Sequence, residues 1–381
     1  MQTHVNISKR DVCRKKYNIG ELELDINGEN IKATGVSSSS VYNPKRITVI
    51  ITAHTRQEFI RTAIDSVLSQ DIDMNDVEVI LIRNFFDTDI EALAERFNIK
   101  LVYSDSTLGI KIRLGIEQSQ GEIITFLEDD DIYEHNRLSH ILEIFSREQS
   151  IVYYHNASLT IDKSGITLPG NYYSGYDGIL VLNSNELEIK DINSIHRFSA
   201  FNQLSSIAVR RAAIFPNIKS VDSISVSVDR FIFFASLVRG GKIVIDGEKL
   251  TRYRFHNSLS NPMGEIKERR VSFANIASRK LSDYSIINSL DFFPNSVIGT
   301  LSLIGYSEAV LESQILINRH NYLNRVNLAN HIRFLLVVSL KIRSIPYLML
   351  VILSTIELLS HRVANSLFIS WLNRKYEMLI H

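Results

Sequence analysis

The sequence predicts an α/β protein with an open, mostly parallel sheet between helices and a helical C-terminal region. Short apolar runs alternate with amphipathic helical stretches from Ile47 to about Phe145. Short connections join them, which is typical of a sheet covered by helices. From about Gly264 the pattern becomes mainly helical. We therefore divide the 381 residues into an appendage and linker (1–45), a sheet domain (46–262, with halves 46–150 and 151–262) and a helical region (263–381).

The first half of the sheet domain has four apolar runs that suit buried parallel strands. They are 47–51, 77–82, a run starting at 99, and 122–127. Thr55 and Glu58 have capping-box spacing and predict a helix start. The segment Leu108 to Gln120 alternates as a strand would, but Gly121 can end a helix and a strand follows at once, so we predict a helix.

The second half, 151–262, is expected to continue the same sheet. It contains a Tyr- and Gly-rich loop at 170–178 and an apolar helical stretch, "VSVDRFIFFASLVRGG", which Gly240 and Gly241 can close. Two further runs, "KIVID" and "KLTRYRF", are predicted as strands.

The most apolar stretch runs from Phe334 to Leu359, and Lys341 and Arg343 interrupt it. Its uninterrupted part, Ile345 to Ile356, is shorter than the roughly 20 residues that span a bilayer. Two interpretations stay open: a buried helical hairpin, or a peripheral membrane contact through the C-terminal helices. In the second interpretation, the charged ends of five basic side chains would lie in the polar headgroup region of the membrane. These are Lys341, Arg343, Arg362, Arg374 and Lys375.

Composition excludes several classes of protein. Lys plus Arg and Asp plus Glu both number 42, so no net charge attracts nucleic acid and no nucleic-acid partner is expected. The single cysteine, Cys13, excludes an internal disulfide framework and indicates a reducing, cytoplasmic setting. The first 45 residues are polar without a secretory pattern, with a hairpin signal at Asn27-Gly28 and a linker-like Ser37 to Ser40.

Four consecutive carboxylates, Glu128 to Asp131, follow the fourth predicted strand. Like charges repel, so this run needs a counter-charge. Ligands bind at the carboxyl ends of such strands, and hard divalent cations prefer carboxylate oxygens. The run therefore indicates a metal site shared with a diphosphate. The alternative is a solvated acidic helix start, the role that we expect for Asp131.

The stretch from Ile47 to Leu138 resembles the nucleotide-binding half of a family 2 glycosyltransferase with the GT-A fold. "ITVIITAHTRQEFIRTAIDSVLSQ" is similar to the family's opening strand and helix, and "GEIITFLEDDDIYEHNRL" to its Asp-x-Asp segment. The resemblance implies Mg²⁺ or Mn²⁺ as cofactor, with Asp130 as metal ligand. Glu128, where Asp is usual, would face the metal or the ribose, and Asp129 is the alternative acid.

The resemblance also implies which residues contact the nucleotide sugar. Thr52, His54 and Arg56 match the turn after the first strand. Arg83 and Asn84 replace an Asp pair that often binds the base, although the Asn84 amide can still pair with a base edge. Lys111 or Arg113 would neutralise the diphosphate. The list of nucleotide-sugar contacts is Thr52, His54, Arg56, Asn84, Lys111 and Asp129.

The second half supplies the remaining parts of the resemblance. Asp229 matches the catalytic base, while Val228 replaces the Glu that commonly precedes it. Because Asp229 lies in an apolar helix, we expect burial to raise its pKa. His256 matches a residue that completes the metal or diphosphate site, and Ser205 and Ser206 would line the sugar pocket.

The resemblance implies an inverting transfer of a sugar from a nucleotide-diphospho-sugar to an acceptor hydroxyl or phosphate. The acceptor would be a glycan or a lipid-linked molecule, reached in the cytoplasm or at the cytoplasmic face of the membrane. One alternative is a sugar nucleotidyltransferase, although "TAHTRQEF" lacks the glycines of its phosphate loop. The other is an inert nucleotide-sugar-binding or scaffold protein, to which the departures at Arg83, Glu128 and Val228 point.

Overall fold

The computed structural model describes seven segments of the chain. They are 46–169, 178–256, 266–290, 296–317, 325–342, 345–357 and 363–371. Several sequence predictions lie outside the described residues: the appendage 1–45 with its hairpin and linker, most of the loop 170–178, and the basic residues Arg343, Arg362, Arg374 and Lys375.

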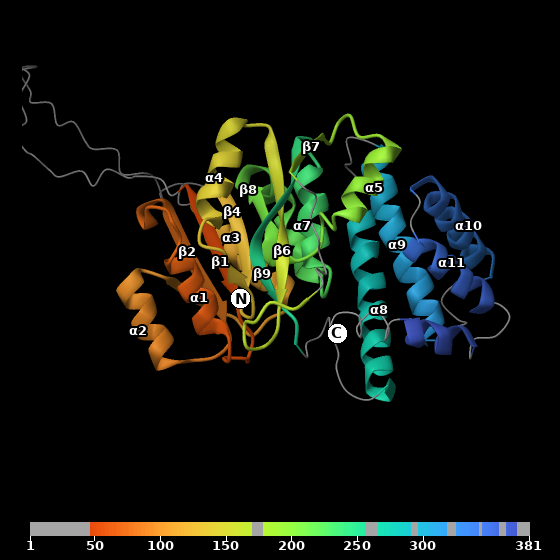
Figure 1. Cartoon of the computed structure of the whole chain (residues 1–381), viewed down its shortest axis with the longest axis horizontal. Coiled ribbons are helices and arrows are strands. Elements are labelled where there is room, and N and C mark those ends of the chain that lie inside the picture. The colour runs from red at the N-terminus through yellow and green to blue at the C-terminus, as the bar shows by residue number, and fades with distance from the viewer. Residues whose placement is uncertain are drawn as a thin grey trace, which may run out of the picture. The chain divides into compact units, whose positions relative to one another are not determined.

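In the described part, nine strands form one sheet (Figure 1). They are β1 (Ile47–Thr52), β2 (Val77–Arg83), β3 (Lys100–Tyr103), β4 (Ile123–Glu128), β5 (Ile132–Tyr133), β6 (Ile151–Ile161), β7 (Ile179–Asn183), β8 (Ile207–Arg210) and β9 (Lys242–Arg254). The order is β3-β2-β1-β4-β8-β6-β9-β5, and β7 also pairs with β9. β1 to β4 are mutually parallel, as are β6 and β9. This confirms the predicted α/β class, and the two last predicted strands are one continuous strand, β9.

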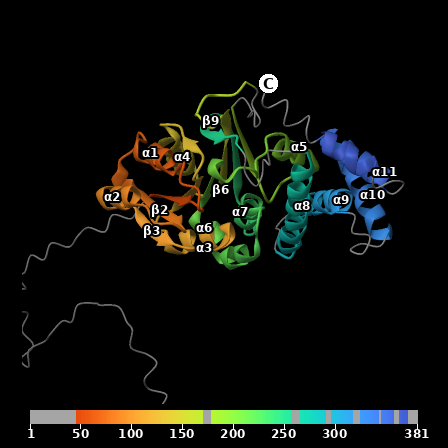
Figure 2. The same cartoon turned by 90° about the horizontal axis from the view of Figure 1, so that it is seen from below.

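Helices cover both faces of the sheet because side chains alternate along its strands. Val49 and Ile51 pack with one apolar cluster, whereas Ile50 packs with the other. The first cluster faces α1 and α4, and the second faces α3 and α7 (Figure 2). The helices of this part are α1 (Ile60–Leu68), α2 (Thr88–Phe97), α3 (Leu108–Gln118), α4 (Arg137–Arg147), α5 (Ile189–Arg197), α6 (Arg211–Ile214) and α7 (Val228–Leu237). The helix predicted over 108–120 is therefore confirmed.

The predicted capping box at the start of α1 is wrong. The helix begins at Ile60 after Phe59, and no side chain caps it. Thr55 has a positive φ of 52°, and its backbone N–H donates to Oδ1 of Asn84 at 2.7 Å. Thr55 therefore belongs to the loop after β1, where a tertiary contact outweighs the local capping preference.

The C-terminal region is helical, as predicted. It contains α8 (Ile266–Asn288), α9 (Ser296–Ile317), α10 (Arg325–Ile342) and α11 (Ile345–Glu357), and residues 363–371 are also helical. α10 and α11 pack against each other and against α9 (Figure 1). No helix in the described residues is long and apolar enough to cross a bilayer.

The C-terminal helices share an apolar core with the sheet domain. One continuous cluster contains Phe231 of α7, Ile287 of α8 and Ile304 of α9. At the far end, the Tyr347 hydroxyl on α11 lies 2.8 Å from Nδ1 of His196 on α5. The domain boundary near residue 262 stays a prediction, and the packing around α7 crosses it.

Candidate active site

The candidate site lies at the carboxyl ends of β1 and β4. These strands are parallel neighbours in which Thr52 pairs with Glu128, so the loop after β1 starts beside the acidic run. The backbone N–H of Asp129 donates to the carbonyl of Thr52 at 3.1 Å. Thr52 itself is buried, and it acts here through its backbone.

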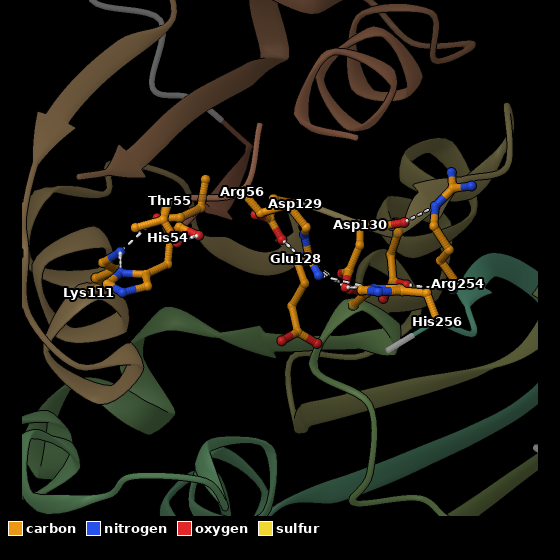
Figure 3. A network of polar contacts seen from close by, with 12 residues as sticks. His54, Thr55, Arg56, Lys111, Glu128, Asp129, Asp130, Arg254 and His256 are labelled. Atoms are coloured by element: carbon orange, nitrogen blue, oxygen red, sulfur yellow. Dashed lines mark hydrogen bonds and ion pairs between the residues drawn. The ribbon is translucent and has the colours of Figure 1, made fainter. Parts of the chain in front are cut away.

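Arg56 and His256 converge on the acidic run from opposite ends of the sequence (Figure 3). Nη2 of Arg56 lies 2.7 Å from Oδ2 of Asp130 and also contacts Oδ1 of Asp129. Nε2 of His256 lies 2.7 Å from the same Asp130 oxygen and 3.0 Å from Nη1 of Arg56. The chain thus supplies positive charge to the two central carboxylates.

These contacts separate the pKa values of the two acids. Burial and the charge of Asp130 raise the pKa of Asp129 to about 6, against the opposing effect of Arg56. Burial also acts to raise the pKa of Asp130, but the hydrogen bond with His256 and the charge of Arg56 together lower it. Asp130 is therefore the acid that this arrangement keeps ionised.

Glu128 points elsewhere. In Figure 3 its side chain extends away from the contact between Asp130 and His256. Burial first, and then the charges of Asp130, Asp131 and Asp229, raise its pKa well above the usual range. Asp229 contributes to this shift although it comes from the second half of the domain.

Asp131 is not the helix-start residue that we expected. The strand β5 follows it, and α4 begins only at Arg137. Asp131 is buried, with 1% of its surface exposed, and its Oδ1 accepts from the backbone N–H of Arg254 at 2.9 Å. Burial and the charge of Asp130 raise its pKa to about 8. This hydrogen bond joins the end of the acidic run to β9.

Lys111 reaches the site, whereas Arg113 does not. Nζ of Lys111 donates to the carbonyl of Ala53 at 2.6 Å and lies 3.2 Å from Nδ1 of His54, although the Lys111 side chain is almost fully buried. Burial lowers the pKa of Lys111. Arg113 instead pairs with Glu117 and Asp222.

Arg83, the last residue of β2, and Asn84, which follows it, have different hydrogen-bond partners. They stand at the positions where the resemblance leads us to expect an Asp pair. Arg83 is buried, pairs with Glu91 on α2 and donates to the carbonyl of Phe85. Asn84 links the loops after three strands, since its Oδ1 accepts from Thr55 and its Nδ2 donates to Asp105 at 2.8 Å. Asn84 therefore joins the loops after β1, β2 and β3, with both ends of its amide engaged.

Asp229 lies in the first turn of α7. Its Oδ2 accepts from the backbone N–H of Gln203 at 3.0 Å, and its Oδ1 accepts from the backbone N–H of Arg230 at 2.8 Å. Burial raises its pKa despite the charge of Arg230, which confirms the predicted direction. A carboxyl with a raised pKa is a stronger base when ionised than an exposed one.

The prediction that Ser205 and Ser206 line a sugar pocket is wrong, because both are fully buried. The Ser205 hydroxyl accepts from the backbone N–H of Glu128 at 3.1 Å. The Ser206 hydroxyl donates to Oε1 of Gln203 at 3.1 Å. These serines support the acidic run and the segment that holds Asp229.

Sequence reasoning missed two residues that shape the site, Gln203 and Arg254. Gln203 has a φ of 66°, which directs its N–H to Asp229. Arg254 holds Asp131 through its backbone, and its Nε donates to the carbonyl of Asp130 at 2.7 Å. The acidic run needs positive charge, and that need could have pointed to Arg254, two residues before His256. Nothing in the sequence marked Gln203.

The predicted metal ligands are only partly brought together. Asp130 and His256 lie in contact, whereas Glu128 is directed away, and the described residues contain no group of three or more acids, histidines or cysteines arranged to hold a metal ion. Mg²⁺ is commonly held by one or two carboxylates and by substrate phosphates. The oxygen and imidazole donors of Asp130 and His256 fit such a shared site, with the diphosphate as the further ligand.

Comparison with known families agrees with this geometry. Residues 48–205 match the family described as Glycosyl transferase family 2. This segment includes β1 to β4 and the whole acidic run. The segment that carries the acidic run therefore resembles glycosyl transferase family 2, as the sequence motifs indicated.

Individual relatives are distant. The chain is 25% identical over 130 residues to an uncharacterized glycosyltransferase of Rickettsia prowazekii, covering 33% of this chain and 40% of that protein. It is 28% identical over 138 residues to one of Rickettsia bellii, covering 34% and 19%. The chain thus spans less than half the length of these relatives.

One solved structure resembles most of the chain. The crystal structure of residues 1–349 of S. aureus TarS in complex with UDP-GlcNAc superposes with a TM-score of 0.50 at 12% identity. The match covers 84% of this chain and 88% of that one. At this identity the likeness concerns the fold.

Proposed function

We propose that the protein transfers a sugar from a nucleotide-diphospho-sugar to an acceptor hydroxyl or phosphate with inversion at the anomeric carbon. Asp229 takes the proton of the acceptor as its oxygen attacks, and the nucleoside diphosphate leaves toward the acidic run. Arg56 and Lys111 meet the negative charge of the departing diphosphate. Asn84 and the loop after β1, including His54, face the nucleotide.

The observation that carries this proposal is that one short segment, 203–205, contacts both Asp229 and Glu128. The backbone N–H of Gln203 donates to Asp229, and the Ser205 hydroxyl accepts from the backbone N–H of Glu128. The half-buried Asp229 is thus joined through this segment to the end of the strand whose following acids contact Arg56 and His256. A base on one side and a charged diphosphate site on the other are the parts that such a transfer needs.

A divalent metal, Mg²⁺ or Mn²⁺, is part of the proposal. Asp130 and His256 would hold it, with Asp129 as the neighbouring acid. When bound, it would neutralise charge on the leaving diphosphate as a Lewis acid. Arg56 contacts the Asp130 carboxylate, so its positive charge would oppose the binding of a cation there.

Three departures from the family pattern pointed to an inert protein, and one of them, Arg83, has a structural role. Arg83 is tied to Glu91 and to a backbone carbonyl, so its replacement of an acid has a structural explanation. Glu128 and Val228 remain departures from the family pattern. The nucleotidyltransferase alternative has no observation in its favour, since the loop after β1 carries no glycine.

For the acceptor we propose a glycan or lipid-linked molecule, with a peripheral membrane contact through α10 and α11. Large apolar side chains are exposed on these helices beside the exposed Lys341. They are Leu336, Val337, Leu340, Ile345 and Ile352. Flotation with vesicles of phosphatidylglycerol and phosphatidylcholine tests this contact, and a protein that stays with the unbound fraction would refute it.

The donor half of the proposal is tested with a panel of nucleotide sugars, each with and without Mn²⁺. UDP-GlcNAc comes first because TarS, the structural relative, was crystallised with it. We expect one donor to raise the thermal midpoint and to be hydrolysed slowly in the absence of an acceptor. Asp130→Asn should lose both effects. If no nucleotide sugar binds or is hydrolysed by the wild type, the proposed function is wrong.

A further inference from the structure

The start of α7 is held by a residue from the C-terminal region. Asp283 lies on α8 and is fully buried. Its Oδ1 accepts from the backbone N–H of Ser225 at 2.8 Å and from the Ser225 hydroxyl at 3.1 Å. Its Oδ2 accepts from the backbone N–H groups of Val226 and Ser227, both at 2.8 Å. One carboxylate thus binds three consecutive backbone N–H groups.

These three N–H groups precede α7, and Ser227 is its N-cap residue, whose own side chain makes no capping hydrogen bond. A carboxylate near a helix N-terminus is favoured by the helix dipole. Asp283, on a helix more than fifty residues away in sequence, therefore fixes the segment that leads into α7 rather than capping its first turn.

The neighbouring residue of α8, Tyr284, binds Arg230, which directly follows Asp229. The Tyr284 hydroxyl accepts a hydrogen bond from Nη1 of Arg230, and the guanidinium lies 5.6 Å from the Tyr284 ring centroid. Glu308 on α9 lies 3.6 Å from the same Arg230 nitrogen. Asp229 thus lies between a segment held by Asp283 and a side chain held by Tyr284.

Close packing keeps α8 in this place. A Cβ atom on Gly305 of α9 would lie 2.2 Å from the Tyr284 ring, so only glycine lets the ring approach this closely. Tyr284 is 2% exposed. Side chains in such contacts have little freedom to shift.

We propose that Asp283 is a positioning residue for the candidate base: the C-terminal helix α8 fixes the segment 225–227 and thereby the orientation of Asp229. The inference rests on the proposed function, since it gives Asp229 the role of base. Its consequence is that the sheet domain cannot align its own base without α8. A displacement of a reacting group by about 1 Å can lower a rate by about 100-fold.

The test uses the full chain and Asp283→Asn, which keeps the shape but replaces one acceptor oxygen by a donor. Two quantities are measured. One is the hydrogen-exchange rate of the backbone amides in 225–231. The other is the rate of UDP-GlcNAc hydrolysis with Mn²⁺, divided by the number of binding sites found by titration with UDP. We expect exchange to accelerate by at least about fivefold, because hydrogen bonds to a charged acceptor are weakened. We expect kcat to fall by about tenfold to 100-fold, with the UDP dissociation constant unchanged.

Asp73→Asn is the matched control. Asp73 accepts from the backbone N–H of Asn75 at the start of the short helix before β2, at the end of that strand opposite the site. It should change neither quantity. Tyr284→Phe removes one hydroxyl and is the second variant if Asp283→Asn does not fold; a smaller fall in kcat, of about threefold, is expected.

Unchanged exchange in 225–231 would overturn the inference, and so would faster exchange with an unaltered hydrolysis rate per site. Absence of hydrolysis in the wild type would overturn the proposed function with this donor and the catalytic part of the inference. The exchange measurement would then still decide whether Asp283 holds the segment. The two failures are therefore distinguishable.

Discussion

Nη2 of Arg56 lies 2.7 Å from Oδ2 of Asp130, on the oxygen that also contacts His256. A guanidinium from the loop after β1 therefore occupies part of the space beside the acid that we expect to bind metal. Arg56 thus supplies counter-charge to the two central acids of the run, Asp129 and Asp130.

Arg56→Gln should bind Mn²⁺ more tightly than the wild type in the absence of a nucleotide. The change removes a positive charge beside Asp130, and we expect the Mn²⁺ dissociation constant to fall by about tenfold, equivalent to about 1.4 kcal/mol. Free Mn²⁺ measured by electron paramagnetic resonance gives the constant. Arg61→Gln is the control, because Arg61 pairs with Asp65 on the surface of α1. Equal or weaker Mn²⁺ binding by Arg56→Gln would contradict the prediction.

Asp229→Asn should lose turnover and keep nucleotide binding. The amide cannot take a proton, and removing a general base commonly lowers kcat by about 100-fold to 10,000-fold. Hydrolysis of the active donor and calorimetric titration with the nucleoside diphosphate measure the two effects. Asp222→Asn, which loses only the pairing with Arg113, should behave as the wild type. An Asp229→Asn protein with full turnover would remove Asp229 from the mechanism.

Asp131 should make the stability of the folded chain depend on pH. Its pKa is raised from 3.8 to about 8, so the folded chain keeps a proton that the unfolded chain releases. That stabilising contribution is lost as the pH rises from about 4 to about 8. Asp131→Asn stays neutral, so the wild type should become less stable relative to this variant across that window. Urea unfolding at pH 5 and pH 8 measures the difference, and a constant difference would refute the prediction.

Gly109→Ala should destabilise the fold where the two halves of the domain meet. Gly109 is the second residue of α3, and a Cβ atom there would lie 2.1 Å from the carbonyl oxygen of Val221 and 2.7 Å from that of Ile224. Backbone atoms cannot move aside cheaply, and we expect a loss of about 1–3 kcal/mol in the free energy of unfolding. Alanine normally favours a helix over glycine, so a stabilised variant in urea unfolding would contradict this contact.

The periodicity of the sequence predicted the fold class well. The strands β1, β2 and β4 are mostly apolar and are buried along nearly their whole length, because both faces of the sheet are covered, and such runs are visible without a structure. The helix α3 was predicted from its ending despite its strand-like alternation. The pairing of β6 with β9 and the continuity of β9 depend on contacts distant in sequence, which periodicity does not report.

The candidate site was predicted less completely. The pairing of Asp130 with His256 and the raised pKa of Asp229 agree with the sequence-based expectations. The error at Asp131 arose because a buried acid that binds a backbone N–H of β9 looks, in sequence, like a helix start. The positive φ of Gln203 has no sequence signature, since glycine is the residue that usually marks such a conformation.

The amide of Asn84 closes the loops after β1, β2 and β3 on one another, through Thr55 on one side and Asp105 on the other. A side-chain amide has two hydrogens and two oxygen lone pairs, so these two bonds leave one of each for a further partner. A base edge with one donor and one acceptor could therefore pair with Asn84 while both existing bonds stay in place. The same amide would then join three loops and read one edge of a ligand.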